Sequence, residues 1–192
     1  MLSGDHRIYL QYKPTTDSLA YLLEWQKSAI KENPQARPVQ SDRLHLTVIH
    51  VGIIQDVYRE LSAHLPQLDW ITYTSALHEF ITQSQSLLPK QVSVEPKGFA
   101  MFGHNSSVLA IALTPDTQLE QAHARSLEQL KLFFKTCGME FPVPFMQGSP
   151  NFRYALTLRP HISLLKAARH RPPALQDVPN TLQLEAMPIH YT

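Results

Sequence analysis

The chain has 192 residues, a formal net charge of +1 and an apolar fraction of 43%. The apolar content is enough for a sizeable core and argues against extended disorder. The near-zero charge excludes binding to nucleic acid through a global basic field, so any phosphate site must be built from local charge. Cys137 is the single cysteine, so an intramolecular disulfide is impossible, which suits a reducing compartment.

The N-terminal segment lacks the apolar core of a signal peptide, and no stretch is apolar over the length of a membrane span. We therefore expect a cytoplasmic protein without a membrane partner. At this length the chain could fold as one domain or as two small lobes that share a cleft.

In the first half of the chain, apolar periodicity and proline breaks predict two strands and three helices. The inward-facing stripe of the first helix is apolar except at Gln26. In order, we expect a strand at 7–13, a helix that starts at 15–17 and stops at 33–34, a polar loop at 35–42, a strand from 44 that closes at Gly52, a helix at 56–65, a break at Pro66 and a helix at 67–87.

The second half begins with strands and a hairpin turn, which we expect to lie beside the strand at 44–52. A helix follows, and then a proline-rich segment with no helical or strand period. In order, we expect strands at 91–95, 99–102 and 108–113, the first two separated by Pro96–Gly98, a turn at 103–107, a helix that starts at 114–116 and ends at Gly138, a rigid loop at 140–150, a strand that starts at 153–158 and continues into 161–163, and a last strand at 181–187.

Two apolar segments of strand length each carry a histidine and, two places later, a hydroxyl residue. The first contains His45 and Thr47, and the second contains His161 and Ser163. Residues i and i+2 of a strand share a face, so each hydroxyl is expected beside its histidine. Imidazole can carry a proton in either direction near neutral pH, and a hydroxyl can donate to a phosphate oxygen. Two such strands that face each other across a cleft would form a phosphate site with an acid and a base on opposite sides.

The bare pattern is weak, because the chain contains ten histidines and four His-x-Ser/Thr triplets. The other two triplets begin at His104, within turn chemistry, and at His190, close to the end of the chain. Only the first two triplets lie in apolar runs of strand length. The alternative for His45 and His161 is that both are ordinary core histidines.

The two segments resemble the paired His-x-Thr/Ser signatures of the two-histidine phosphoesterase superfamily, which includes 2′-5′ RNA ligase-like proteins and cyclic nucleotide phosphodiesterases. The resemblance implies an α+β fold, duplicated and two-lobed, with antiparallel sheets backed by helices around a central cleft and with one motif in each lobe. It implies that residues 1–192 form a single two-lobed domain.

The resemblance also implies that His45, Thr47, His161 and Ser163 are the catalytic residues, with the imidazoles as acid and base and the hydroxyls on the non-bridging oxygens. The substrate would be an RNA end or a small nucleotide with a cyclic phosphate or a 2′-5′ linkage. The candidates for substrate binding are basic or aromatic residues of the sequence, and these are Arg43, Arg159, Lys166, Phe102 and Tyr154. A regular strand would turn Lys166 away from the face of Ser163, so Lys166 can contribute only at a strand end or a bulge.

The sequence contains no compact metal-ligand motif and no glycine-rich phosphate loop, so we expect neither a metal nor a cofactor. Ile49 stands where many ligase-like members carry a basic residue, which weakens an assignment as a ligase. Two other functions stay open: an RNA- or nucleotide-binding module with a degenerate site, and a structural protein without catalysis. We expect a monomer.

Overall fold

The computed structural model describes residues 6–172 and 174–187, so the segment before His6 and the triplet that begins at His190 lie outside the described residues. The strands are β1 (Arg7–Pro14), β2 (Arg37–Pro38), β3 (Leu46–Ile53), β4 (Gln91–Phe102), β5 (Val108–Pro115), β6 (His161–Lys166) and β7 (Leu182–Ala186). The α-helices are α1 (Thr16–Glu32), α2 (Ile54–His64), α3 (Trp70–Leu87), α4 (Thr117–Thr136) and α5 (Pro142–Gly148). Three short 3₁₀ turns are η1 (Ser41–Arg43), η2 (His104–Ser106) and η3 (Arg153–Leu156).

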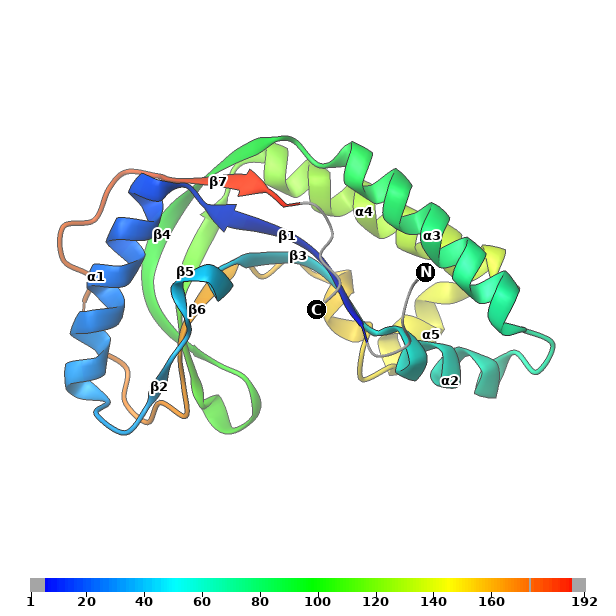
Figure 1. Ribbon diagram of the computed structural model, residues 1–192, viewed down its shortest axis with the longest axis horizontal. Coiled ribbons are helices and arrows are strands. Elements are labelled where there is room, and N and C mark those ends of the chain that lie inside the picture. The colour runs from blue at the N-terminus through cyan, green and yellow to red at the C-terminus, as the bar shows by residue number, and fades with distance from the viewer. Residues whose placement is uncertain (1–5, 173, 188–192) are drawn as a thin grey trace.

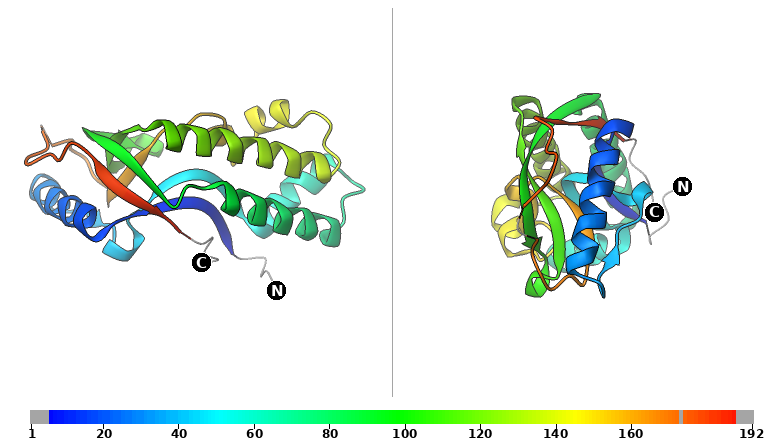
Figure 2. Two further views of the ribbon diagram at one scale, coloured as in Figure 1. Left: turned by 90° about the horizontal axis from the view of Figure 1, so that it is seen from above. Right: turned by 90° about the vertical axis from the view of Figure 1, so that its left-hand side faces the viewer.

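The strands form one antiparallel sheet in the order β2-β6-β3-β1-β7-β4-β5, and an additional pairing of β5 with β6 closes it. In Figure 1 the sheet arches across the molecule, with α1 at one end and the other helices at the opposite end. Figure 2 shows α3 and α4 running side by side along the sheet, and these two helices pack against each other. The expected α+β, two-lobed architecture with antiparallel strands backed by helices is confirmed.

The alternation of side chains along β1 shows how the sheet separates a core from an open face. Ile8, Leu10 and Tyr12 are fully buried, whereas the residues between them are half-exposed. Because a strand turns successive side chains to opposite faces, burial of one face leaves the other available for polar residues. No helix among residues 6–172 and 174–187 is both long and apolar enough to cross a membrane.

Two expectations about the hairpin region are wrong. Pro96 does not separate two strands, because β4 runs without a break from Gln91 to Phe102 with only a register shift near Gly98. Proline is tolerated there because β7 pairs with β4 only as far as Val94, so the missing N–H of Pro96 leaves no gap in that ladder. The hairpin also lies beside β6, the second motif strand, and not beside β3.

Three expectations about the segment around α4 and α5 are also wrong. The cap of α4 is Asp116, whose carboxylate accepts a hydrogen bond from the Leu119 amide, while Thr114 still belongs to β5. The segment expected as a rigid loop contains α5, because Pro142 stands in the first helical turn, where no intrahelical N–H is needed. Residues 153–158 do not begin a strand, since Arg153–Leu156 form η3 and β6 starts only at His161.

Candidate active site

The two motif strands lie side by side, and Leu46 is paired with Ile162 across the antiparallel ladder. This register places His45 opposite Ser163 and Thr47 opposite His161, one step to either side of the pair. The sequence correctly predicts that each hydroxyl shares the face of its histidine, but the motifs do not face each other across a gap. All four side chains are half-exposed, while Leu46 and Ile162 are fully buried on the other face. The histidines are therefore not ordinary core residues.

Both imidazoles are held in the same orientation by the backbone. Nδ1 of His45 lies 2.8 Å from the carbonyl oxygen of Arg43, and Nδ1 of His161 lies 2.8 Å from that of Arg159. A carbonyl only accepts hydrogen bonds, so each Nδ1 carries the proton of its bond. Nε2 is then the nitrogen that remains for a substrate, and it is unprotonated whenever the ring is neutral.

The arginines predicted to bind phosphate contribute mainly through their backbones. Arg43 belongs to η1 and Arg159 precedes β6, so neither continues the strand alternation of its motif. Both side chains are exposed, and only their carbonyl oxygens contact the histidines. A role for either guanidinium in substrate binding stays a prediction.

The pKa of His45 is lowered from its usual value, mainly because the ring is partly buried. The hydrogen bond to the carbonyl of Arg43 opposes this shift, and repulsion from His161, Lys13 and Lys166 adds to it. These effects favour the neutral form of the His45 ring near neutral pH.

Lys166 is turned to the histidine face by a bulge in β6. On β5, Leu109 pairs with Leu165 and Ala110 pairs with Ser163, so Leu164 has no partner there. As a result, Leu164 and Leu165 are both fully buried and the exposed Lys166 follows them. The sequence correctly indicated that only a strand end or a bulge could bring Lys166 round.

The same irregularity occurs at the same place in β3. Leu10 pairs with Ile49 and Gln11 pairs with Thr47, so Val48 is the extra residue. Each bulge therefore directly follows the hydroxyl residue of its motif, and the fifth residue after each histidine returns to the histidine face. That residue is Lys166 in β6 and His50 in β3, so the two halves of the site repeat each other in detail.

Aromatic rings flank the two histidines on both sides. The ring of Phe102 stacks on that of His161, with centroids 4.2 Å apart and planes 12° apart. The ring of Tyr9 lies near His45 and near His50, with ring centroids 6.1 Å and 5.0 Å apart, respectively. Phe102 thus contacts one of the two motif histidines, and its role in substrate binding stays a prediction.

Tyr154 is 60% exposed and lies in η3. Its hydroxyl accepts a hydrogen bond of 2.9 Å from the guanidinium of Arg153, which also lies over the ring. Within the described part of the chain no hydrogen bond or ring contact connects Tyr154 with the four motif residues. Its role in substrate binding stays a prediction.

The sequence did not indicate four residues of the histidine face, and these are Tyr9, Gln11, Lys13 and His50. Tyr9 and Lys13 are half-exposed on β1, and their alternation with Leu10 and Tyr12 was the available signal. No local pattern indicates which strand becomes the neighbour of β3. Local sequence also does not show on which face of the sheet His50 lies, because that depends on the bulge at Val48 in β3.

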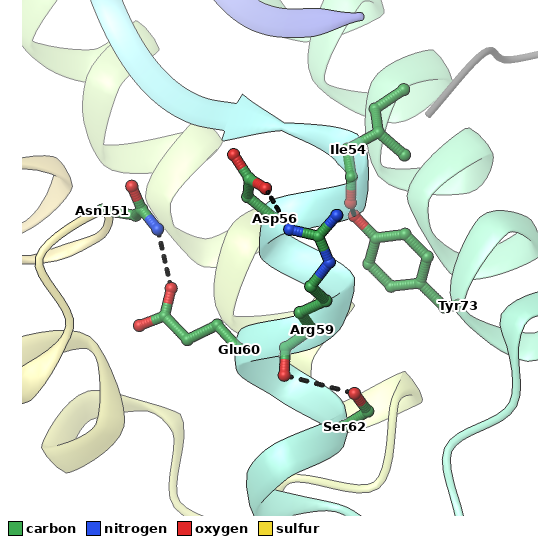
Figure 3. A network of polar contacts seen from close by, with 7 residues as sticks. All are labelled: Ile54, Asp56, Arg59, Glu60, Ser62, Tyr73 and Asn151. Carbon is green, nitrogen blue, oxygen red and sulfur yellow. Dashed lines mark hydrogen bonds and ion pairs between the residues drawn. The ribbon is translucent and has the colours of Figure 1, made fainter. Parts of the chain in front are cut away.

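His50 is held by the segment that leads toward η3. Burial lowers the pKa of His50, repulsion from Arg7 lowers it further, and a hydrogen bond to the backbone of Asn151 opposes both. The side-chain amide of Asn151 donates in turn to Glu60 of α2 over 2.8 Å, as Figure 3 shows. The figure also shows the hydroxyl of Tyr73, which donates to the carbonyl oxygen of Ile54 at the start of α2.

The site is an open face of the sheet, next to a hollow of about 480 Å³. This hollow is lined by residues close to Phe102 and Lys166 in sequence, namely Met101, Asn105–Ser107 and Ala167–Arg169. Among the residues that the structure describes, no group of three or more His, Cys, Asp or Glu side chains could hold a metal ion.

Comparison with solved structures shows that this chain shares its fold with LigT. Escherichia coli LigT superposes with a TM-score of 0.52 at 15% identity, over 99% of this chain and 95% of LigT. TT0787 of Thermus thermophilus gives 0.52 at 18% identity, over 94% of this chain and 81% of that chain. A structure described as a phosphoesterase gives 0.51 at 14% identity, over 97% and 98% of the two chains.

These superpositions show a common fold, and at these identities they show nothing beyond the fold. No protein-family model matches the sequence, and comparison with characterised protein sequences gives no match.

Proposed function

We propose that this protein is a metal-independent phosphodiesterase that acts on a 2′,3′-cyclic phosphate or a 2′-5′ linkage of RNA or of a nucleotide. The observation that supports this most strongly is the register of Leu46 with Ile162, which brings two His–hydroxyl pairs onto one exposed face. Each imidazole there has its Nδ1 bound to a carbonyl, so that Nε2 is left for the substrate.

Two imidazoles supply both proton transfers that opening a cyclic phosphate requires. A water oxygen attacks phosphorus and gives its proton to Nε2 of one histidine. The bond from phosphorus to one ribose oxygen breaks, and Nε2–H of the other histidine protonates that oxygen. The product is a phosphomonoester, and the total protonation of the pair is unchanged.

We assign the role of proton acceptor in the hydrolytic direction to His45. Its pKa is lowered by burial and by the neighbouring positive charges, so its Nε2 is free at neutral pH. His161 then acts as the proton donor, and the roles reverse for ligation. The hydroxyls of Thr47 and Ser163 donate to the non-bridging oxygens as negative charge develops on them.

Positive charge near the site favours an anionic substrate. Lys13 and Lys166 lie close enough to His45 to lower its pKa, and no carboxylate contributes to that environment. The fold is shared with E. coli LigT, which has been crystallised with phosphate and with ATP. An aromatic ring at Phe102 suits a nucleobase, because every base offers a π face for stacking.

The test is hydrolysis of a 2′,3′-cyclic mononucleotide in the presence of a metal chelator, with His45→Ala and His161→Ala as variants. We expect each variant to lose about 10²–10⁴-fold in turnover, because each removes a general acid or base. Circular dichroism and a urea midpoint close to those of the parent would show that the fold survives.

Turnover by either variant at the parent rate would disprove the mechanism. If the parent binds phosphate competitively with a nucleotide but turns nothing over, the protein is a binding module with a degenerate site. If phosphate does not perturb the signals of either histidine in NMR spectra, the site has no catalytic or binding role. Loss of activity in chelator, restored by a divalent cation, would contradict the metal-independent reaction.

A further inference from the structure

One polar side chain of α1 is buried beneath the second motif strand. Gln26 is 8% exposed, and its neighbours on the same helix face, Leu22, Trp25 and Ala29, are buried. A buried amide is destabilising unless its hydrogen bonds are made. Nε2 of Gln26 donates to the carbonyl oxygens of Val39, over 2.8 Å, and of Leu164, over 2.9 Å.

Leu164 is the bulge residue of β6 that has no partner on β5. Its carbonyl oxygen accepts a second hydrogen bond, 2.8 Å long, from the amide of Val39. The bulge is therefore fixed from one side by the segment after β2 and from below by Gln26. Of these two donors, the Gln26 amide alone is a side chain, and it comes from a helix.

The bulge determines which side chain of β6 follows Ser163 on the histidine face. Without the extra residue, Leu165 would share the face of Ser163 and Lys166 would point into the core. With it, both leucines are buried and Lys166 is exposed beside the site. The repulsion that Lys166 exerts on His45 independently indicates that its ammonium group is near the imidazole.

We propose that Gln26 is a positioning residue of the active site, whose buried amide holds the bulge at Leu164 and thereby directs Lys166 toward the phosphate bound between the two histidines. This inference rests on the proposed function, because it assumes that the site binds a phosphate group. Gln26 itself does not touch the substrate. It acts through the backbone of β6.

The experiment compares Gln26→Met, Lys166→Met and the double variant. Methionine has nearly the size of glutamine and lacks the donor. Losing a charge-assisted hydrogen bond to phosphate weakens binding by about tenfold or more, so we expect Lys166→Met to raise KM for a 2′,3′-cyclic nucleotide by about that factor, with a smaller effect on kcat. Gln26→Met should raise KM in the same direction, and the double variant should be no worse than Lys166→Met alone, because both changes remove one contact.

Leu22→Ala is the matched control, since it disturbs the same face of α1 without touching Leu164. It should lower the unfolding midpoint and leave KM unchanged. Gln26→Asn, which keeps the amide but shortens its reach, serves as a second variant and should fall between the parent and Gln26→Met. Amide exchange at Val39 should become faster in both Gln26 variants, because its acceptor is less firmly held.

Two results would overturn the proposal. The first is a folded Gln26→Met protein with the parent KM, and the second is a double variant whose KM is the product of the two single effects. If the parent shows no turnover, the proposed function fails, and the same cycle is then measured as the affinity for inorganic phosphate by NMR titration. Equal phosphate affinities of the parent and Gln26→Met would then refute the positioning role separately.

Discussion

Replacing Thr47 by valine separates a catalytic role from a structural one. The side chain of Thr47 is half-exposed on the histidine face, opposite His161 in the ladder. Within the described residues, neither its hydroxyl nor that of Ser163 takes part in a hydrogen bond. Valine has nearly the same shape and an equally branched β carbon, which strands favour.

The two expected magnitudes differ widely. Removing one donor to a developing oxyanion lowers kcat by about 10²–10³-fold, which corresponds to about 2.7–4 kcal/mol of transition-state stabilisation. The site is open and partly hydrated, so we expect the lower end, about 10²-fold. The free energy of unfolding should change by less than about 0.5 kcal/mol, because no internal hydrogen bond is lost and no cavity forms.

The assay combines initial rates on a 2′,3′-cyclic nucleotide with urea unfolding of the same preparations. Thr136→Val, at the exposed end of α4, is the control for the same chemical change away from the site. Ser163→Ala should repeat the pattern of Thr47→Val on the other half of the site. Thr47→Val with the parent rate would refute the role of the hydroxyl, and so would a loss of activity that is accompanied by a comparable loss of stability.

Three further outcomes are expected. Lys166→Met should raise the pKa of His45, because it removes a repelling charge, and the acidic limb of the pH–rate profile should move to higher pH. Burial lowers the pKa of His123 in the folded protein. As the pH drops below about 6.5, this histidine is therefore protonated in the unfolded chain before it is protonated in the folded one, and the free energy of unfolding falls. Urea unfolding at a series of pH values measures how steeply the free energy of unfolding changes with pH. His123→Gln should reduce this slope by at most about 1.4 kcal/mol per pH unit, and an unchanged slope would contradict the role of His123. Tyr73→Phe removes a buried 2.8 Å hydrogen bond to Ile54 and should cost about 1–2 kcal/mol of unfolding free energy, and no cost would mean that water replaces the bond.

Proline chemistry explains two of the expectations that are wrong, the break at Pro96 and the rigid loop at 140–150. A missing N–H matters only where the folded chain would have offered it a partner. At Pro96 the neighbouring strand β7 has already diverged, and at Pro142 the helix has just begun. The hydrogen-bond partner of a given backbone N–H depends on how the strands and helices pack together, so local sequence patterns do not predict it.

The sequence alone determined the side-chain pattern of each half of the site. The two-residue period of a strand is a local property, so His45 with Thr47, and His161 with Ser163, share a face whatever lies beside them. The apolar residues between them guaranteed that the opposite face would be buried. The α+β arrangement followed from the order of the periodic segments.

Only the tertiary structure decided how the two halves meet and what surrounds them. The pairing of Leu46 with Ile162 and the bulges after Thr47 and Ser163 depend on contacts between segments that lie far apart in sequence. Strand register is fixed by which faces the whole chain can bury together, and one extra residue reverses every side chain beyond it. For this reason Lys166 and His50 joined the histidine face, and a buried amide on α1 gained its partner at Leu164.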